Sequence, residues 1–82
     1  MTDYKKQWTK KAEKLLLGKK IVKVEWMGEN EAEEMDWNSK PVCLLLDNDM
    51  WVFPMRDDEG NDGGAMAYGE DTFPVLGVED EK

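Results

Sequence analysis

With 82 residues, 37% of them charged, and a net charge of −8, the chain predicts one small domain spanning residues 1–82. The absence of His and the single Cys exclude His-based catalysis, four-Cys zinc sites and an intramolecular disulfide. No apolar run approaches the ~20 residues that span a membrane. No signal peptide opens the chain, so we expect a cytoplasmic protein that does not enter a membrane.

The charge is divided unevenly along the chain. Residues 1–28 carry eight Lys against three acidic residues, a balance of +5, whereas residues 29–82 carry sixteen acidic residues against three basic ones, a balance of −13. Such an asymmetry predicts one electropositive face and one strongly electronegative face. The simplest alternative is that these charges keep the protein soluble and pair within the fold.

The first predicted element is an amphipathic helix over residues 3–17. Its apolar side chains recur about one helical turn apart and form one stripe: Tyr4, Trp8, Ala12, Leu15 and Leu16. Three lysines, Lys6, Lys10 and Lys14, fall on the opposite side, and Gly18 is a typical helix end.

The remaining predicted elements are short. They are a strand at 20–27, a short helix at 30–37, a hairpin at 42–55, an acidic loop at 56–71 and an edge strand at 72–78. In the first strand, Val22, Val24 and Trp26 alternate with charged residues, which predicts one buried face. This order predicts an α+β fold in which the N-terminal helix packs on a small, mainly antiparallel β-sheet, and it leaves open whether that sheet is partly rolled.

The acidic loop is the strongest candidate for a binding site. Its first nine residues, 56–64, contain four acids, one Asn and three Gly, a composition that no packed helix or strand favours. The predicted binding residues are Asp57, Asp58, Glu59, Asn61 and Asp62 in the loop, with Trp37, Met66 and Tyr68 as exposed apolar neighbours.

Two other kinds of site are open alternatives. Carboxylate and amide oxygens at near-alternate positions of the loop are ligands that divalent cations accept, although the spacing does not fit a calcium-binding helix–loop–helix. The lysines of the first helix could instead contact nucleic acid. The many acids downstream and the single Arg argue against direct nucleic-acid binding.

No residue pattern predicts catalysis. Cys43 lies within the most apolar run of the chain, which predicts a buried structural thiol and not a nucleophile. The acids are numerous, but nothing in the sequence places one of them in a pocket that would raise its pKa. We therefore expect a protein that is not an enzyme and needs no cofactor.

Three segments together resemble a group of small bacterial and phage-type proteins. These segments are 31–37 (EAEEMDW), 40–42 (KPV) and 56–65 (RDDEGNDGGA). The group pairs an EAEE-x-x-W turn with a D-x-EGN-x-x-GA loop after a hairpin, and the likeness covers most of residues 18–76. The resemblance implies a bacterial or phage origin and the same segment order, and it implies no activity.

Taken together, these features predict a small acidic protein-interaction module. The 56–71 loop would bind a protein with a basic surface, and its acids could mimic the phosphates of a polyanion. The sequence leaves the identity of the partner and the oligomeric state open.

Overall fold

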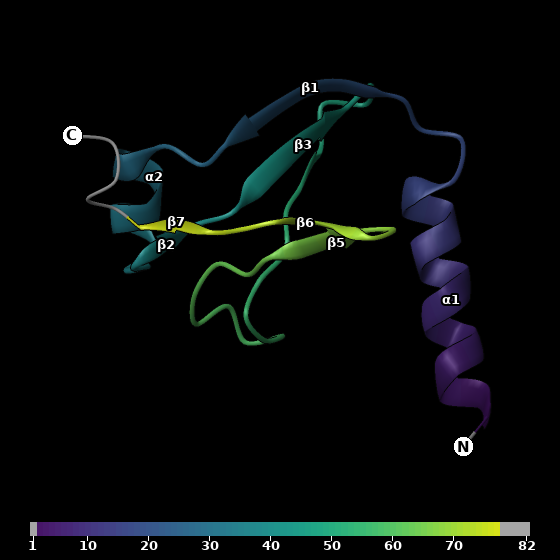
Figure 1. Ribbon diagram of the computed structural model, residues 1–82. Coiled ribbons are helices and arrows are strands. Elements are labelled where there is room, and N and C mark those ends of the chain that lie inside the picture. The colour runs from purple at the N-terminus through teal and green to yellow at the C-terminus, as the bar shows by residue number, and fades with distance from the viewer. Residues whose placement is uncertain (1, 78–82) are drawn as a thin grey trace.

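The computed structural model describes residues 2–77 and shows an α+β fold (Figure 1). Its elements are α1 (Thr2–Leu16), β1 (Ile21–Trp26), α2 (Glu29–Glu34), β2 (Ser39–Lys40), β3 (Val42–Leu46), β4 (Trp51–Val52), β5 (Met66–Tyr68), β6 (Asp71–Phe73) and β7 (Leu76–Gly77). The predicted α+β fold class is confirmed, and within residues 2–77 the strands form small antiparallel sheets. Val78, the predicted end of the last strand, lies outside the described residues.

The largest sheet has the order β1-β3-β4 and is antiparallel throughout. Val24 lies opposite Leu44, whereas Glu25 lies opposite Cys43, so the two pairs belong to opposite faces. The register shifts between Ile21 and Lys23 at a bulge. The sheet therefore has one face with Val24 and another with Glu25 and Cys43.

The helix α2 contributes Ala32 to the core on the Cys43 face. Buried Met27, Ala32, Trp37 and Cys43 form one apolar cluster, and the half-buried Phe53 packs against it. The predicted helix at 30–37 begins one residue later than α2 and extends three residues beyond its end. It ends early because Asp36 adopts a left-handed backbone with φ of 63°, which stops helical hydrogen bonding.

Phe73 and Pro74 pack against Trp26, which lies on the same face of the main sheet as Val24. The Trp26 indole N–H donates to the Pro74 carbonyl (2.9 Å), and its ring meets Phe73 edge to face at 6.5 Å between centroids. The predicted loop at 56–71 is wrong in its second half, because β5 lies within it and pairs with β6. The predicted edge strand at 72–78 is also divided, since the residues around Pro74 separate β6 from β7.

The N-terminal helix does not pack on the sheet, which corrects the prediction made from its apolar stripe. Every described side chain from residue 3 to residue 18 is exposed, including Tyr4 (69%) and Trp8 (53%). Val22 and Val24, the predicted inward residues of the first strand, are exposed as well. The two apolar surfaces that were expected to cover each other both face solvent.

Within residues 2–77, no helix combines the length and apolar character needed to cross a membrane.

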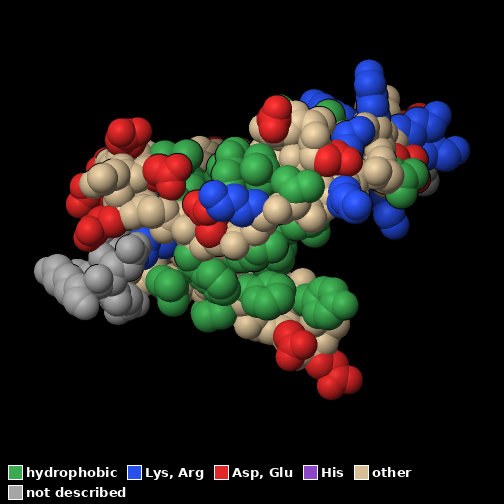
Figure 2. All heavy atoms as spheres, turned by 90° about the horizontal axis from the view of Figure 1, so that it is seen from above, with side chains coloured by type: hydrophobic (Ala, Val, Ile, Leu, Met, Phe, Trp, Pro, Cys, Tyr) green, Lys and Arg blue, Asp and Glu red, His purple; other side chains and the backbone are tan. Residues whose placement is uncertain are grey.

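The charges are segregated along the molecule. Figure 2 shows Lys side chains gathered over α1 at one end, whereas Asp and Glu side chains gather at the opposite end, around α2. The lysines of α1 are Lys5, Lys6, Lys10, Lys11 and Lys14, and the acids of α2 are Glu29, Glu31, Glu33 and Glu34. The predicted electropositive and electronegative regions are thus separate ends of one elongated molecule of 45 × 29 × 28 Å.

Candidate functional site

The first half of the acidic loop is a tightly hydrogen-bonded structural unit. The Asp57 carboxylate accepts hydrogen bonds from the side-chain amide of Asn61 (2.8 Å) and from the backbone N–H groups of Asn61 and Glu59. These bonds and the nearby Arg56 charge lower the pKa of Asp57. Asp57 therefore shapes the turn that it begins.

Asp62 ties this loop to the segment before β2. One of its carboxylate oxygens accepts from the backbone N–H groups of Asn38 (3.2 Å), Ser39 (3.1 Å) and Gly63 (2.8 Å). A Cβ at Gly63 would lie 2.7 Å from the Pro41 ring, so only Gly allows this close approach. One oxygen of the Asp62 carboxylate is therefore occupied by backbone N–H groups, and the residue is half-buried.

The loop also covers Trp37. The Trp37 indole N–H donates to the Gly60 carbonyl (2.8 Å), and Gly60 has a left-handed φ of 74°. Trp37 is only 5% exposed and meets Phe53 edge to face at 6.0 Å between centroids. The prediction that Trp37 is exposed is therefore wrong.

The structure does not gather the predicted binding residues into one patch. Asp57 and Asp62 serve the loop itself, Trp37 lies beneath it, and Met66 is half-buried on β5. The remaining four are exposed: Asp58, Glu59, Asn61 and Tyr68. Tyr68 lies on the β5–β6 hairpin, outside the hydrogen-bonded first half of the loop. Whether any of them binds a partner stays a prediction.

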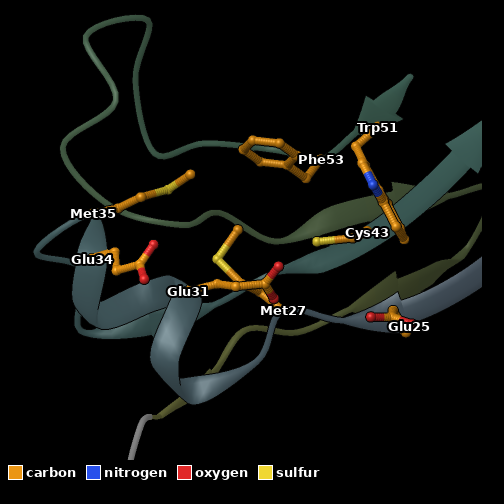
Figure 3. A pocket seen from close by; sticks show the side chains of 8 residues that line it. All are labelled: Glu25, Met27, Glu31, Glu34, Met35, Cys43, Trp51 and Phe53. Atoms are coloured by element: carbon orange, nitrogen blue, oxygen red, sulfur yellow. The ribbon is translucent and has the colours of Figure 1, made fainter. Parts of the chain in front are cut away.

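A pocket opens on the Cys43 face of the main sheet, between the sheet and α2 (Figure 3). Its volume is about 280 Å³. Apolar and sulfur-bearing side chains form its floor and walls: Met27, Met35, Cys43, Trp51 and Phe53. Three carboxylates complete the lining, Glu25 from β1 and Glu31 and Glu34 from α2. We call this site the acidic pocket.

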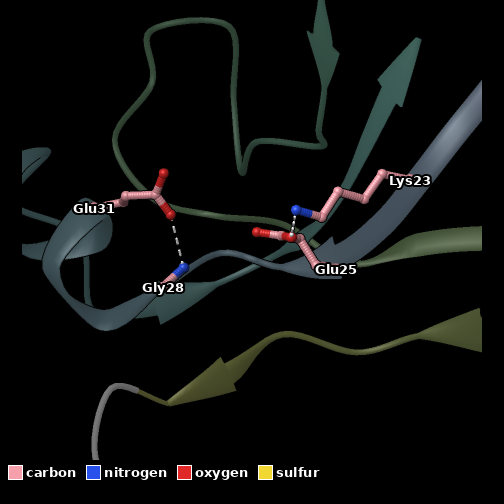
Figure 4. Close-up of polar contacts among 4 residues, drawn as sticks. All are labelled: Lys23, Glu25, Gly28 and Glu31. Atoms are coloured by element: carbon pink, nitrogen blue, oxygen red, sulfur yellow. Dashed lines mark hydrogen bonds and ion pairs between the residues drawn. The ribbon is translucent and has the colours of Figure 1, made fainter. Parts of the chain in front are cut away.

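The three carboxylates of the acidic pocket differ in what they already bind, and Figure 4 shows the contacts of two of them, Glu25 and Glu31. Glu31 accepts a hydrogen bond from the Gly28 backbone N–H (3.0 Å) and so caps α2. Glu25 lies 3.1 Å from the Lys23 ammonium in an exposed ion pair, which contributes little stability. Within residues 2–77, the Glu34 carboxylate has no hydrogen bond or ion pair, so it is available to a ligand cation.

The Cys43 thiol is buried at the floor of the acidic pocket, as the sequence predicts. It donates to the Pro41 carbonyl at 3.7 Å. Burial, reinforced by the negative charges of Glu31 and Glu25, raises the pKa of the Cys43 thiol from 9.0 to about 11. A neutral thiol is a poor nucleophile, so the site offers no activated cysteine.

We expect iodoacetamide to alkylate Cys43 at least ~10-fold more slowly in the folded protein at pH 8 than in urea, because the thiol is buried and protonated. The pKa of the Cys43 thiol is higher in the folded protein than in the unfolded chain. The protonated thiol therefore stabilises the fold fully below pH 9. This stabilisation is then lost as the pH rises through about 11, by at most about 2–3 kcal/mol in all. Urea unfolding from pH 8 to 11, compared with a Cys43→Ala variant, checks this loss. Equal alkylation rates in the folded and unfolded protein would contradict the burial.

The sequence holds one signal for the acidic pocket that composition alone does not show. Glu31 and Glu34 are three residues apart on one helix and so share a side of it. Glu25, Cys43 and Trp51 can be assigned to one face of the sheet only once the strand register is known.

In residues 2–77, no three His, Cys, Asp or Glu side chains come close enough to hold one metal ion. The loop carboxylates therefore do not converge as the metal alternative requires.

Comparisons of the chain with models of known protein families, with curated proteins and with solved structures found no match in any of the three. The resemblance to small bacterial and phage-type proteins thus stays a prediction. The site must be interpreted from its own chemistry.

Proposed function

We propose that this protein is a non-enzymatic interaction module whose acidic pocket binds a basic, amphipathic segment of a protein partner. The observation that supports this best is the combination of an apolar floor with three carboxylates around it. Aliphatic stems of Lys or Arg side chains would lie along Met27, Met35 and Phe53, and their charged ends would reach the carboxylates. The exposed part of Trp51 offers a ring face to a cation.

The strong acidity of this end of the molecule supports the same proposal. α2 carries four glutamates and no basic residue in its last turn, so a basic partner would be attracted before contact. The loop at 56–64 is a weaker candidate, because two of its carboxylates already hold backbone N–H groups. A basic segment at the acidic pocket therefore replaces the loop as the proposed binding mode.

A binding experiment separates the two surfaces. We expect a fluorescent helical peptide with a Leu/Trp stripe flanked by Lys to bind the protein, and Glu25→Gln/Glu34→Gln to weaken it roughly 10-fold at low salt. The matched control, Asp58→Asn/Glu59→Gln, removes the same charge from the exposed part of the loop and should leave affinity nearly unchanged. Fluorescence anisotropy measures both. If the control weakens binding and the pocket variant does not, the loop is the site.

A further inference from the structure

The N-terminal helix presents an apolar ridge that no other element within residues 2–77 covers. Tyr4 and Trp8 pack on each other edge to face, with 6.3 Å between centroids. Leu15, which is 53% exposed, continues the same ridge toward the end of the helix. A lone helix of this length is only marginally stable in water. The helix therefore needs another surface to cover this ridge.

Positive charge borders the ridge on both sides. At ~100° per residue, Lys5 and Lys11 lie roughly 60° to either side of Trp8. The Lys11 ammonium lies 5.0 Å from the centroid of the Trp8 ring. The ridge of α1 is thus apolar in the middle and basic at its edges.

The acidic pocket has the complementary arrangement. Its floor is apolar, and Figure 3 shows Glu25 on β1 at one side, with Glu31 and Glu34 on α2 toward the other. The ridge of α1 would bury Trp8 against the floor while each flanking lysine meets a carboxylate. The ridge of α1 is therefore a basic, amphipathic segment of the kind that the acidic pocket is proposed to bind.

The helix is held away from the pocket of its own chain. The connection from α1 to β1 is hydrogen-bonded at both ends, from the Lys19 N–H to the Leu16 carbonyl (3.1 Å) and from the Asp47 N–H to the Lys20 carbonyl (2.8 Å). Gly18, with φ of 79°, closes the end of the helix. Figure 1 shows α1 beyond one end of β1 and α2 beyond the other. Two copies lying side by side in opposite directions would bring α1 of each to α2 of the other.

We propose that two copies of this chain form a two-fold symmetric dimer in which α1 of each copy fills the acidic pocket of the other. The two contacts are identical, so the assembly closes and needs no third copy. The proposal rests on the proposed function of the acidic pocket and names its ligand as a second copy of this chain. A different basic segment would bind by displacing α1.

Charge exchange between two variants tests the dimer. We expect sedimentation equilibrium to show a dimer for the full chain. Lys5→Glu/Lys11→Glu and Glu25→Lys/Glu34→Lys should each raise the dissociation constant roughly 100-fold, because like charges then face each other. The control Lys6→Glu/Lys10→Glu makes the same charge change on the far side of α1 and should leave the dimer intact. Glu31 is left unchanged because it caps α2.

Mixing the two disrupted variants is the decisive step. Each variant's helix then matches the other's pocket, so an equimolar mixture should dimerise again. A monomeric wild type overturns the proposal, as does a mixture that stays monomeric or a control that dissociates equally. DNA or RNA binding at 0.15 M salt that depends on Lys5 and Lys11 would also overturn it, because the ridge would then serve nucleic acid.

The peptide titration separates this proposal from the proposed function. Whether the wild type is a dimer or a monomer, the pocket of the Lys5→Glu/Lys11→Glu protein is empty. This variant should therefore bind the unrelated basic peptide. Peptide binding by this variant together with a monomeric wild type rejects the dimer and keeps the interaction module. If the variant does not bind the peptide and the wild type is monomeric, both the dimer and the proposed function are rejected.

Discussion

Replacing Trp37 by Ala is expected to destabilise the domain by about 3–5 kcal/mol, the usual effect of deleting a buried aromatic side chain. Trp37 joins three parts of the fold, since it packs with Ala32 and Phe53 and donates to the Gly60 carbonyl. The loss approaches the total stability of a small domain, about 5–15 kcal/mol. Urea unfolding followed by far-ultraviolet circular dichroism measures the effect.

Two further variants separate the causes of that loss. Trp37→Phe keeps a buried ring and removes the bond to Gly60, so it should cost less, about 1–3 kcal/mol. Tyr68→Ala removes an aromatic ring that is 70% exposed, so it should change stability by less than about 0.5 kcal/mol. If Trp37→Ala and Tyr68→Ala have equal effects, Trp37 is not the centre of the core.

The local elements could be predicted from the sequence because each depends on neighbouring residues. The stripe from Tyr4 to Leu16 placed the first helix within one residue of its observed ends. The hairpin predicted at 42–55 likewise contains β3 and β4, which pair antiparallel. Periodicity and turn residues are sufficient for such assignments.

The partner of the apolar stripe could not be predicted in the same way. A helix with one apolar face must cover it, but the pattern does not say with which surface. The sheet of the same chain was the nearest choice, and the ordered connection through Gly18 and Lys20 rules out that choice in this structure. The prediction failed because the position of the helix depends on residues 17–20, which connect α1 to β1.

The candidate site shows a second limit. A run of acids and glycines predicts a loop, but it does not say whether each carboxylate meets solvent or backbone N–H groups. Asp57 and Asp62 bind backbone, and Asp58 remains exposed, although all three look alike in the sequence. The acidic pocket joins Glu25, Glu34 and Trp51 across three elements, which only the register and the position of α2 bring together.

Replacing Asp62 by Ala is expected to cost about 2–3 kcal/mol, the second-largest effect on stability among these variants. One carboxylate oxygen holds the N–H groups of Asn38, Ser39 and Gly63, and two of these residues are half-buried or buried. Without it, donors enclosed between the loop and β2 lose their charged acceptor. Amide hydrogen exchange at Ser39 and Gly63 should speed up, and the urea midpoint should fall.

The neighbouring acid provides the matched control for Asp62. Asp58→Ala removes the same side chain from an exposed position and should leave both measurements nearly unchanged. Asp62→Asn keeps one acceptor oxygen without the charge, so its effect should fall between those of the other two variants. If Asp62→Ala leaves stability intact but Asp58→Ala weakens capture of a basic peptide, the loop acts in binding and not in folding. The opposite result makes the acidic loop a structural element that keeps Trp37 in the core.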